Sequence, residues 1–234
     1  AAAVWCGCVC AVGFYHRQVG YMHSTIDILL VLLLLIDLYV LSISRLHRAI
    51  KVVALQGIVL AIMPLLSEEA ITLHSWLLVL GTLAIKGIVM PYLLFRAIRE
   101  VHLPREIEPY VGFMPSLIWG MAMILISFFA ANRLPLPLAV SSRLWAPVAL
   151  SAVMIGLFLL VARKQAIMQV LGYLVLENGI YIFAMALAAQ MPFLVELGVL
   201  LDLLVGVFIM GIILNHIKEH FDHLDVEQLT VLKD

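Results

Sequence analysis

The sequence has little charge, because Asp, Glu, Lys and Arg make up only 12% of its 234 residues. Hydrophobic residues make up 65%, whereas soluble domains are about half apolar and carry about twice as much charge. The apolar residues form long unbroken runs, which excludes a membrane β-barrel, since barrel strands alternate apolar and polar residues. We therefore predict an all-α integral membrane protein, with no room for a soluble catalytic domain.

Ligands for metals and haem are also scarce. The three cysteines, Cys6, Cys8 and Cys10, are spaced C-x-C-x-C, and no second set of ligands follows them in the chain. Of the eight histidines only His74 falls inside an expected span, which is too few for the axial ligands of a membrane haem. The chain also lacks a phosphate-binding glycine loop, a nucleophile elbow and an H-E-x-x-H motif. We expect no catalytic, cofactor-binding or metal site in it.

Seven stretches are apolar and about long enough to cross a bilayer, which takes roughly 20 helical residues. We interpret residues 1–21 as an atypical N-terminal extension and residues 216–234 as a cytoplasmic tail. The seven expected transmembrane helices are residues 24–44, 50–66, 70–95, 112–131, 144–162, 166–190 and 192–215.

The basic residues in the loops and at the ends of these spans are unevenly divided between the two sides of the membrane. One side holds three, which are Arg17, Arg133 and Arg143. The other side holds ten, which are Arg45, Arg48, Lys51, Arg96, Arg99, Arg105, Arg163, Lys164, Lys218 and Lys233. Since Lys and Arg accumulate in cytoplasmic loops, the N-terminus is predicted outside and the C-terminus in the cytoplasm. The expected location is the cytoplasmic (inner) membrane of a bacterium or archaeon, crossed several times.

Five ionisable residues lie inside the expected spans and away from the first few residues at each end, although a charge costs about 2.5–3.5 kcal/mol or more at the centre of a bilayer. They are Asp37, Lys86, Glu177, Glu196 and Asp202. Counting 1.5 Å per residue puts Glu177 and Asp202 at similar depths in neighbouring antiparallel helices, and Glu196 nearer the outer end. Because intramembrane acids are rare and costly, these five residues are candidates for a proton pathway.

A purely structural interpretation competes with this one. Lys86 could pair with Asp37 or with one of the other acids and only hold helices together. In the functional interpretation, burial disfavours the charged form of both residue types, so that a proton passes between them at modest cost. A third interpretation is a free-standing cation/proton transporter, which predicts internal repeats and broken helices. The two halves of the chain show no clear repeat.

Four segments carry a resemblance to a known family. The component-E membrane subunit of hydrogenase-four type formate hydrogenlyases resembles this chain over about residues 22–234. The last three helices resemble, more loosely, the K-type subunit of respiratory complex I and the C-type subunit of multisubunit sodium/proton antiporters. The segments are Ile85-KGIVMPYLL, Gly172-YLVLENG-Ile180, Pro192-FLVELGVLLDLLVGVFIMGII and Leu224-DVEQLTVLKD.

The resemblance divides the chain into family-specific helices over residues 22–143 and a K-type-like unit over residues 144–215. Glu177 and Glu196 match the two helix glutamates of the K-type subunit, which belong to a central polar axis in complex I. Lys86 and Asp202 fall in segments that match component E itself. The resemblance thus implies a place in a proton pathway.

The resemblance also implies a complex in which this chain is a non-catalytic subunit of an energy-converting hydrogenase. The implied partners are antiporter-like membrane subunits, a subunit-one-type membrane anchor, and peripheral [NiFe] hydrogenase and iron–sulfur subunits, with lipids around them and no nucleic acid. The [NiFe] centre and iron–sulfur clusters would sit on those partners. The alternatives are a purely structural linker in the same complex and a subunit of a cation/proton antiporter.

Overall fold

A computed structural model describes residues 25–67, 73–100, 110–133 and 143–187, together with residues 205, 206, 209 and 211. The long elements in these ranges are all helices, and α3, η1 and α4 follow one another without a break. Their bounds are Thr25–Ser42, α2 Leu46–Ser67, α3 Leu73–Ala84, the π-helix η1 Ile85–Val89, α4 Met90–Glu100, α5 Phe113–Ala131, α6 Trp145–Ala162 and α7 Ala166–Leu187.

Six of these helical stretches are long and apolar enough to cross a membrane, which confirms the all-α membrane fold. The third lies later in the sequence than expected, because the apolar window extends to Arg99 instead of ending at residue 95. The seventh expected span, residues 192–215, lies outside the described residues except for four helical positions. The six spans are Thr25–Ser42, Leu46–Leu66, Val79–Arg99, Phe113–Ala131, Trp145–Ala162 and Ala166–Ala186.

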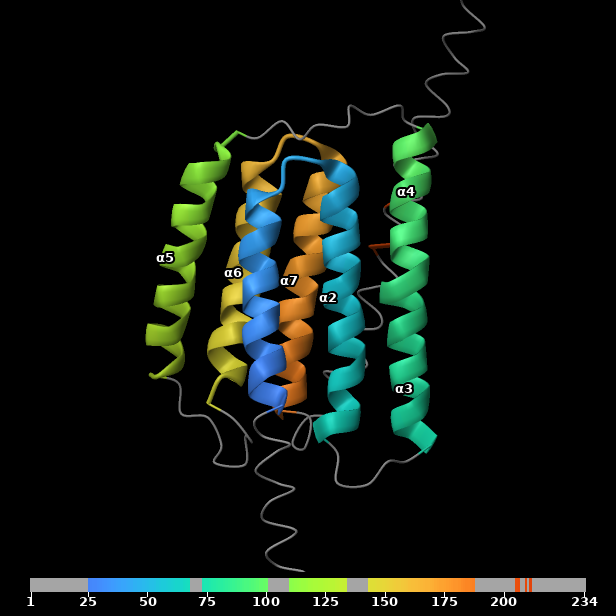
Figure 1. Cartoon of the computed structure of the whole chain (residues 1–234), viewed down its shortest axis with the longest axis vertical. Coiled ribbons are helices and arrows are strands. Elements are labelled where there is room, and N and C mark those ends of the chain that lie inside the picture. The colour runs from blue at the N-terminus through green and yellow to red at the C-terminus, as the bar shows by residue number, and fades with distance from the viewer. Residues whose placement is uncertain are drawn as a thin grey trace, which may run out of the picture.

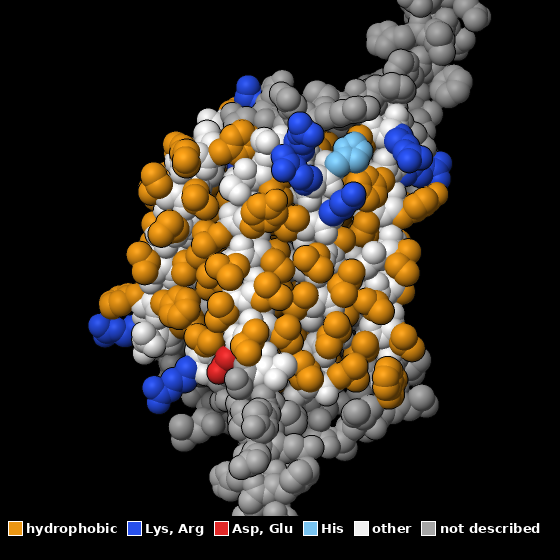
Figure 2. All heavy atoms as spheres, viewed as in Figure 1, with side chains coloured by type: hydrophobic (Ala, Val, Ile, Leu, Met, Phe, Trp, Pro, Cys, Tyr) orange, Lys and Arg blue, Asp and Glu red, His pale blue; other side chains and the backbone are white. Residues whose placement is uncertain are grey.

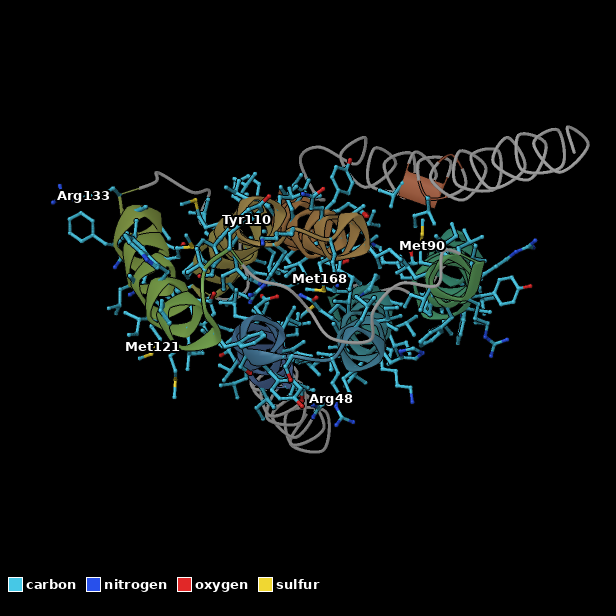
Figure 3. The ribbon with its side chains drawn as sticks, turned by 90° about the horizontal axis from the view of Figure 1, so that it is seen from above. Arg48, Met90, Tyr110, Met121, Arg133 and Met168 are labelled. Carbon is cyan, nitrogen blue, oxygen red and sulfur yellow. The ribbon has the colours of Figure 1, made fainter. Side chains whose placement is uncertain are left out.

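The helices run up and down side by side (Figure 1). Seen from above, α6 and α7 form one row, α2 and the helix Thr25–Ser42 form a second row, and α5 and α3–α4 stand at the two ends (Figure 3). Met168 of α7 points into the space between the rows and is completely buried. The core of this bundle therefore lies where α7 meets the N-terminal helices.

Basic side chains gather at one end of the bundle. The up-and-down course brings the start of α2, the end of α4 and the α6–α7 turn to the same end, while Arg133 and Arg143 lie near the other. Figure 2 shows most of the visible Lys and Arg side chains at the first end, with a wide apolar band below them. This distribution agrees with the uneven charge of the loops, although which end faces the cytoplasm stays a prediction.

Helices α6 and α7 approach so closely that their contact requires glycine. A Cβ atom added to Gly156 of α6 would lie 2.4 Å from the backbone nitrogen of Leu176 on α7 and 2.6 Å from its Cα. One added to Gly179 of α7 would lie 2.7 Å from the backbone nitrogen of Val153. Small residues of this kind let membrane helices pack backbone to backbone.

We expect Gly156→Ala to destabilise the protein by about 1–3 kcal/mol, because the added methyl group must push two helix backbones apart. Gly81→Ala in α3 is the matched control, since a Cβ there meets nothing within 4 Å. Alanine is the better helix former, so the control should be neutral or stabilised by up to about 1 kcal/mol. Thermal unfolding of the purified variants in detergent measures the stability of both. Equal changes in the melting temperature would contradict the close approach of α6 and α7.

Arg163, in the turn between α6 and α7, fastens three chain segments at the basic end. It is fully buried, and its guanidinium donates to the carbonyl of Leu41 at 2.8 Å and to that of Val111 at 3.2 Å. The guanidinium also lies 5.1 Å from the ring centroid of Phe113. Leu41 is in the last turn of its helix, where the negative end of the helix dipole favours a cation. Burial lowers the pKa of the Arg163 guanidinium below its usual value.

Replacing Arg163 with alanine should lower the stability of the protein by about 3 kcal/mol, because two buried carbonyl groups lose a charged donor. Arg133→Ala, which removes an exposed arginine next to the Phe129 ring, should change stability by less than about 1 kcal/mol. Fluorescence-detected size-exclusion chromatography after heating can compare the two. A similar melting midpoint for both variants would show that the hydrogen bonds of Arg163 do not contribute to stability.

Candidate functional site

The turn that carries Lys86 is wider than an α-helical turn. Residues Ile85–Val89 form the π-helix η1, and the N–H of Met90 donates to the carbonyl of Ile85, five residues before it. Pro91 follows directly, and proline cannot donate the helical hydrogen bond and crowds the carbonyl four residues earlier. Single π-turns inside α-helices are frequent at functional sites. The π-turn therefore indicates that Lys86 belongs to a functional site.

A glycine on α2 makes room for the stem of Lys86. A Cβ atom added to Gly57 would lie 2.7 Å from the Cβ of Lys86, so no larger residue fits without a shift. A Cβ atom added to the neighbouring Gly87 would lie 3.3 Å from Cγ1 of Ile58 on α2. The Cβ atom of Lys86 therefore lies directly against α2, and its side chain is buried inside the bundle.

The ammonium group of Lys86 meets two consecutive residues of α7. Its Nζ lies 2.7 Å from Oε1 of Glu177 and donates to Oδ1 of Asn178 at 2.8 Å. The ring centroid of Tyr181, one turn further along α7, lies 5.8 Å from the same nitrogen. Lys86 is 6% exposed and Glu177 only 1%, so the ion pair is shielded from solvent on both sides.

Lys86 also lines a small, mostly apolar recess between α2, α4 and α7. Its open volume is about 10 Å³, which is at the lower limit of what one water molecule needs. The recess therefore offers the ion pair space for about one water. It is lined by Ile50, Val53, Ala54, Gly57, Lys86, Met90, Pro91, Leu94, Leu171, Leu174 and Asn178.

A second buried polar pair lies beside the first. Nε2 of Gln56 on α2 donates to Oδ1 of Asp37 at 2.8 Å, and both side chains are completely buried. Gln56 precedes Gly57 in the chain, so α2 contacts the aspartate with one residue and the lysine with the next. The two polar pairs are thus at about the same height in the bundle.

Comparison with known proteins gives this geometry a family context. The model of the family described as NADH-ubiquinone/plastoquinone oxidoreductase chain 4L matches residues 144–234, which include Glu177 and Asn178. An uncharacterised Mycobacterium tuberculosis protein, Rv0085, is 33% identical over 192 residues, covering 81% of this chain and 87% of its own. Hydrogenase-4 component E of Escherichia coli K12 is 28% identical over 209 residues, covering 86% of this chain and 94% of its own. The chain therefore belongs to the same family as Rv0085, and it is similar to hydrogenase-4 component E over most of its length.

The same identity and coverage hold for hydrogenase-4 component E of Shigella flexneri. No solved structure matches the chain. This similarity, together with the six apolar helices of the described ranges, makes the chain a multi-pass protein of the inner membrane. Its likeness to a hydrogenase-4 component and to chain 4L makes it a membrane subunit of a complex I-like assembly.

The structure brings together some of the five ionisable residues that the sequence predicts inside the spans. Lys86 and Glu177 form an ion pair, and Asp37 lies against Gln56. Glu196 and Asp202 lie outside the described residues, so their positions stay predictions. Within the described ranges, no group of three His, Cys, Asp or Glu side chains could hold a metal ion.

Sequence reasoning missed the neutral partners of these charged residues. Asn178 follows Glu177 directly, and Gln56 lies inside an apolar span, so the signal available was a polar amide in hydrocarbon. The role of Gly57 carried no comparable signal, because a glycine in a membrane helix is common. Only the three-dimensional packing shows that it faces the lysine.

We expect Lys86→Met alone to destabilise the protein by about 3–5 kcal/mol, because it leaves a buried glutamate without its cation. The double variant Lys86→Met with Glu177→Leu removes both charges and should recover most of that loss. A double-mutant cycle measured by thermal unfolding in detergent gives the coupling between the two residues. If the two single effects simply add, the residues are not coupled as an ion pair.

Proposed function

We propose that this chain is a membrane subunit of an energy-converting [NiFe] hydrogenase complex, in which Lys86 and Glu177 transfer a proton. The observation that carries the proposal is the buried ion pair at the π-turn. The similarity to hydrogenase-4 component E supports the complex, and the match to chain 4L supports its likeness to respiratory complexes.

The geometry suits a short proton transfer. The Lys86 nitrogen and the Glu177 oxygen are 2.7 Å apart, and moving one proton from Nζ to Oε1 converts an ion pair into a neutral amine and a neutral acid. In both states an N–H of Lys86 can donate to Asn178, since a neutral amine keeps two protons. Burial makes the charged state costly, which brings the two states closer in free energy.

The path on either side of this pair is also a proposal. Glu196 and Asp202 would continue it along the last helix, as the family resemblance implies. Asp37, the remaining candidate from the sequence, lies on the helix Thr25–Ser42 and bonds to Gln56, so we leave it outside this path. The residues Val205 and Ile209, which follow Asp202 in the chain, are buried in the same core as Met90 of α4. This contact supports a position of the last helix close to the lysine-bearing helix.

The implied partners are large antiporter-like membrane subunits, a subunit-one-type anchor and a peripheral hydrogenase with iron–sulfur subunits. The [NiFe] centre and the clusters would be held by those subunits. The name of the relative, hydrogenase-4 component E, supports the assignment to such a complex. Proton movement through this chain would then be driven by electron transfer in its partners.

A structural linker is the second candidate, and one observation favours it. Lys86 joins the α3–α4 helix to α7 through two hydrogen bonds, one to a charged and one to a neutral acceptor. Such a pair could hold the family-specific helices against the chain 4L-like unit without ever changing its protonation. The linker and the relay differ in whether removing the titratable proton disturbs transport.

Glu177→Gln tests this difference, because glutamine still accepts a hydrogen bond from Lys86 but takes up no proton. We expect proton translocation coupled to hydrogen evolution in inverted vesicles to fall by at least about tenfold, since proton transfer groups typically contribute 100-fold or more. Ser151→Ala on α6 is the control, because it removes a buried hydroxyl group that donates to the carbonyl of Pro147 within its own helix.

The amount of assembled complex must be equal in all vesicles, and it can be measured by the co-purification of the hydrogenase subunits. Wild-type coupling in an assembled Glu177→Gln complex would remove Glu177 from the path and leave the linker function. Partial recovery in Glu177→Asp, which restores a titratable carboxyl in a shorter side chain, would support the relay.

A further inference from the structure

Asp37 and Gln56 form a polar contact in the middle of two membrane helices. Asp37 belongs to the helix Thr25–Ser42 and Gln56 to α2, and neither side chain has any exposed surface. The amide Nε2 of Gln56 donates to Oδ1 of Asp37 at 2.8 Å. Unlike Glu177, which meets the ammonium group of Lys86, Asp37 meets a neutral partner here. Its charge, if present, is therefore not compensated by this contact.

Each side chain of this pair has one further oxygen that lacks a donor. Oδ2 of Asp37 and Oε1 of Gln56 are both buried and have no hydrogen-bond partner within the described residues. An ionised carboxylate has only acceptors, and so does the oxygen of an amide. The pair is thus short of one donor, and a single proton on Oδ2 of Asp37 would supply it.

We propose that Asp37 holds a proton permanently and forms a neutral acid–amide pair with Gln56. The proton sits on Oδ2 of Asp37 and is donated to Oε1 of Gln56, while the amide N–H of Gln56 is donated back to Oδ1. Two parallel hydrogen bonds then join the helix Thr25–Ser42 to α2. This arrangement satisfies both buried oxygens and leaves no net charge in the hydrocarbon region.

The pair differs from the neighbouring site in what it does with its proton. At Lys86 and Glu177 the proton has two alternative holders, a nitrogen and an oxygen at 2.7 Å. Among the described residues, Asp37 is hydrogen-bonded to the amide of Gln56, which is far too weak a base to take the proton away. Asp37 is accordingly a binding site for a fixed proton, and this holds whether or not Lys86 and Glu177 form a relay.

Infrared spectroscopy of the purified chain in lipid tests the protonation state directly. A protonated carboxyl group has a C=O stretching band that a carboxylate lacks, and the wild-type minus Asp37→Asn spectrum isolates the band of Asp37. We expect this band at neutral pH, with the small downshift in D₂O that an exchangeable proton causes. No band in the difference spectrum at neutral pH would overturn the proposal.

The stability of three variants gives an independent readout. Asp37→Asn should unfold at the wild-type temperature, because the asparagine NH₂ replaces the acid O–H as the donor to Gln56. Asp37→Leu should lower the midpoint clearly, since the N–H and the C=O of the Gln56 amide both lose their partner. Gln56→Leu should shift the carboxyl band of Asp37 to higher frequency, because its hydrogen bonds are lost.

An ionised Asp37 that binds a metal cation predicts the opposite pattern. The wild-type protein would then show no carboxyl band, its midpoint would rise with added sodium, and Asp37→Asn would lose this response; this outcome overturns the proposal. Coupling measurements separate the two sites as well. We expect Asp37→Asn to retain hydrogen-coupled proton translocation at the wild-type rate, and a loss as large as that of Glu177→Gln would place Asp37 in the relay instead.

Discussion

The ion pair between Lys86 and Glu177 is the interaction on which the rest of the structure depends. Both groups lie in the part of the bundle that faces hydrocarbon on its outside, where an isolated charge is costly. The lysine must therefore reach the glutamate across the bundle, and three features allow this. The π-turn at Ile85–Val89 presents the lysine, Gly57 leaves space for its stem, and Asn178 takes a second N–H.

The same constraint explains how the helices are arranged. The pair connects the helix α3–α4, in the first part of the chain, with α7, which belongs to the segment that matches chain 4L. Asp37 and Gln56 make a second connection within the first part. Apolar packing fills the space between these contacts, with Met168, Leu171 and Leu174 buried in one core. The ion pair and the apolar packing therefore favour the same arrangement, in which α7 lies next to the helices of the first part of the chain.

Much of the fold could be predicted from composition and run length alone. The apolar runs gave the six described spans to within a few residues, except for the third, in which the charged Arg96 and Arg99 lie inside the helix that continues past residue 95. The position of the site could also be predicted, because Lys86 and Glu177 each lie well inside an apolar span. Which acid would meet Lys86 could not be predicted, because five ionisable residues allow several pairs and only the packing of α2 against η1 selects one. The amide partners Gln56 and Asn178 were missed for a related reason, since their role depends on neighbours that are distant in sequence.

The clamp at Arg163 has a consequence for how the bundle can move. It joins the end of the helix Thr25–Ser42, the segment before α5 and the α6–α7 turn through two carbonyl groups, and the N–H of Tyr110 bonds to the carbonyl of Ala162 at the same end. No comparable arginine links several segments at the opposite end of the described helices, where Arg133 is exposed. Among the described helices, Arg163 therefore cross-links the bundle at its basic end. If the helices separate, we expect the separation to start at the end near Arg133, while the end held by Arg163 stays closed.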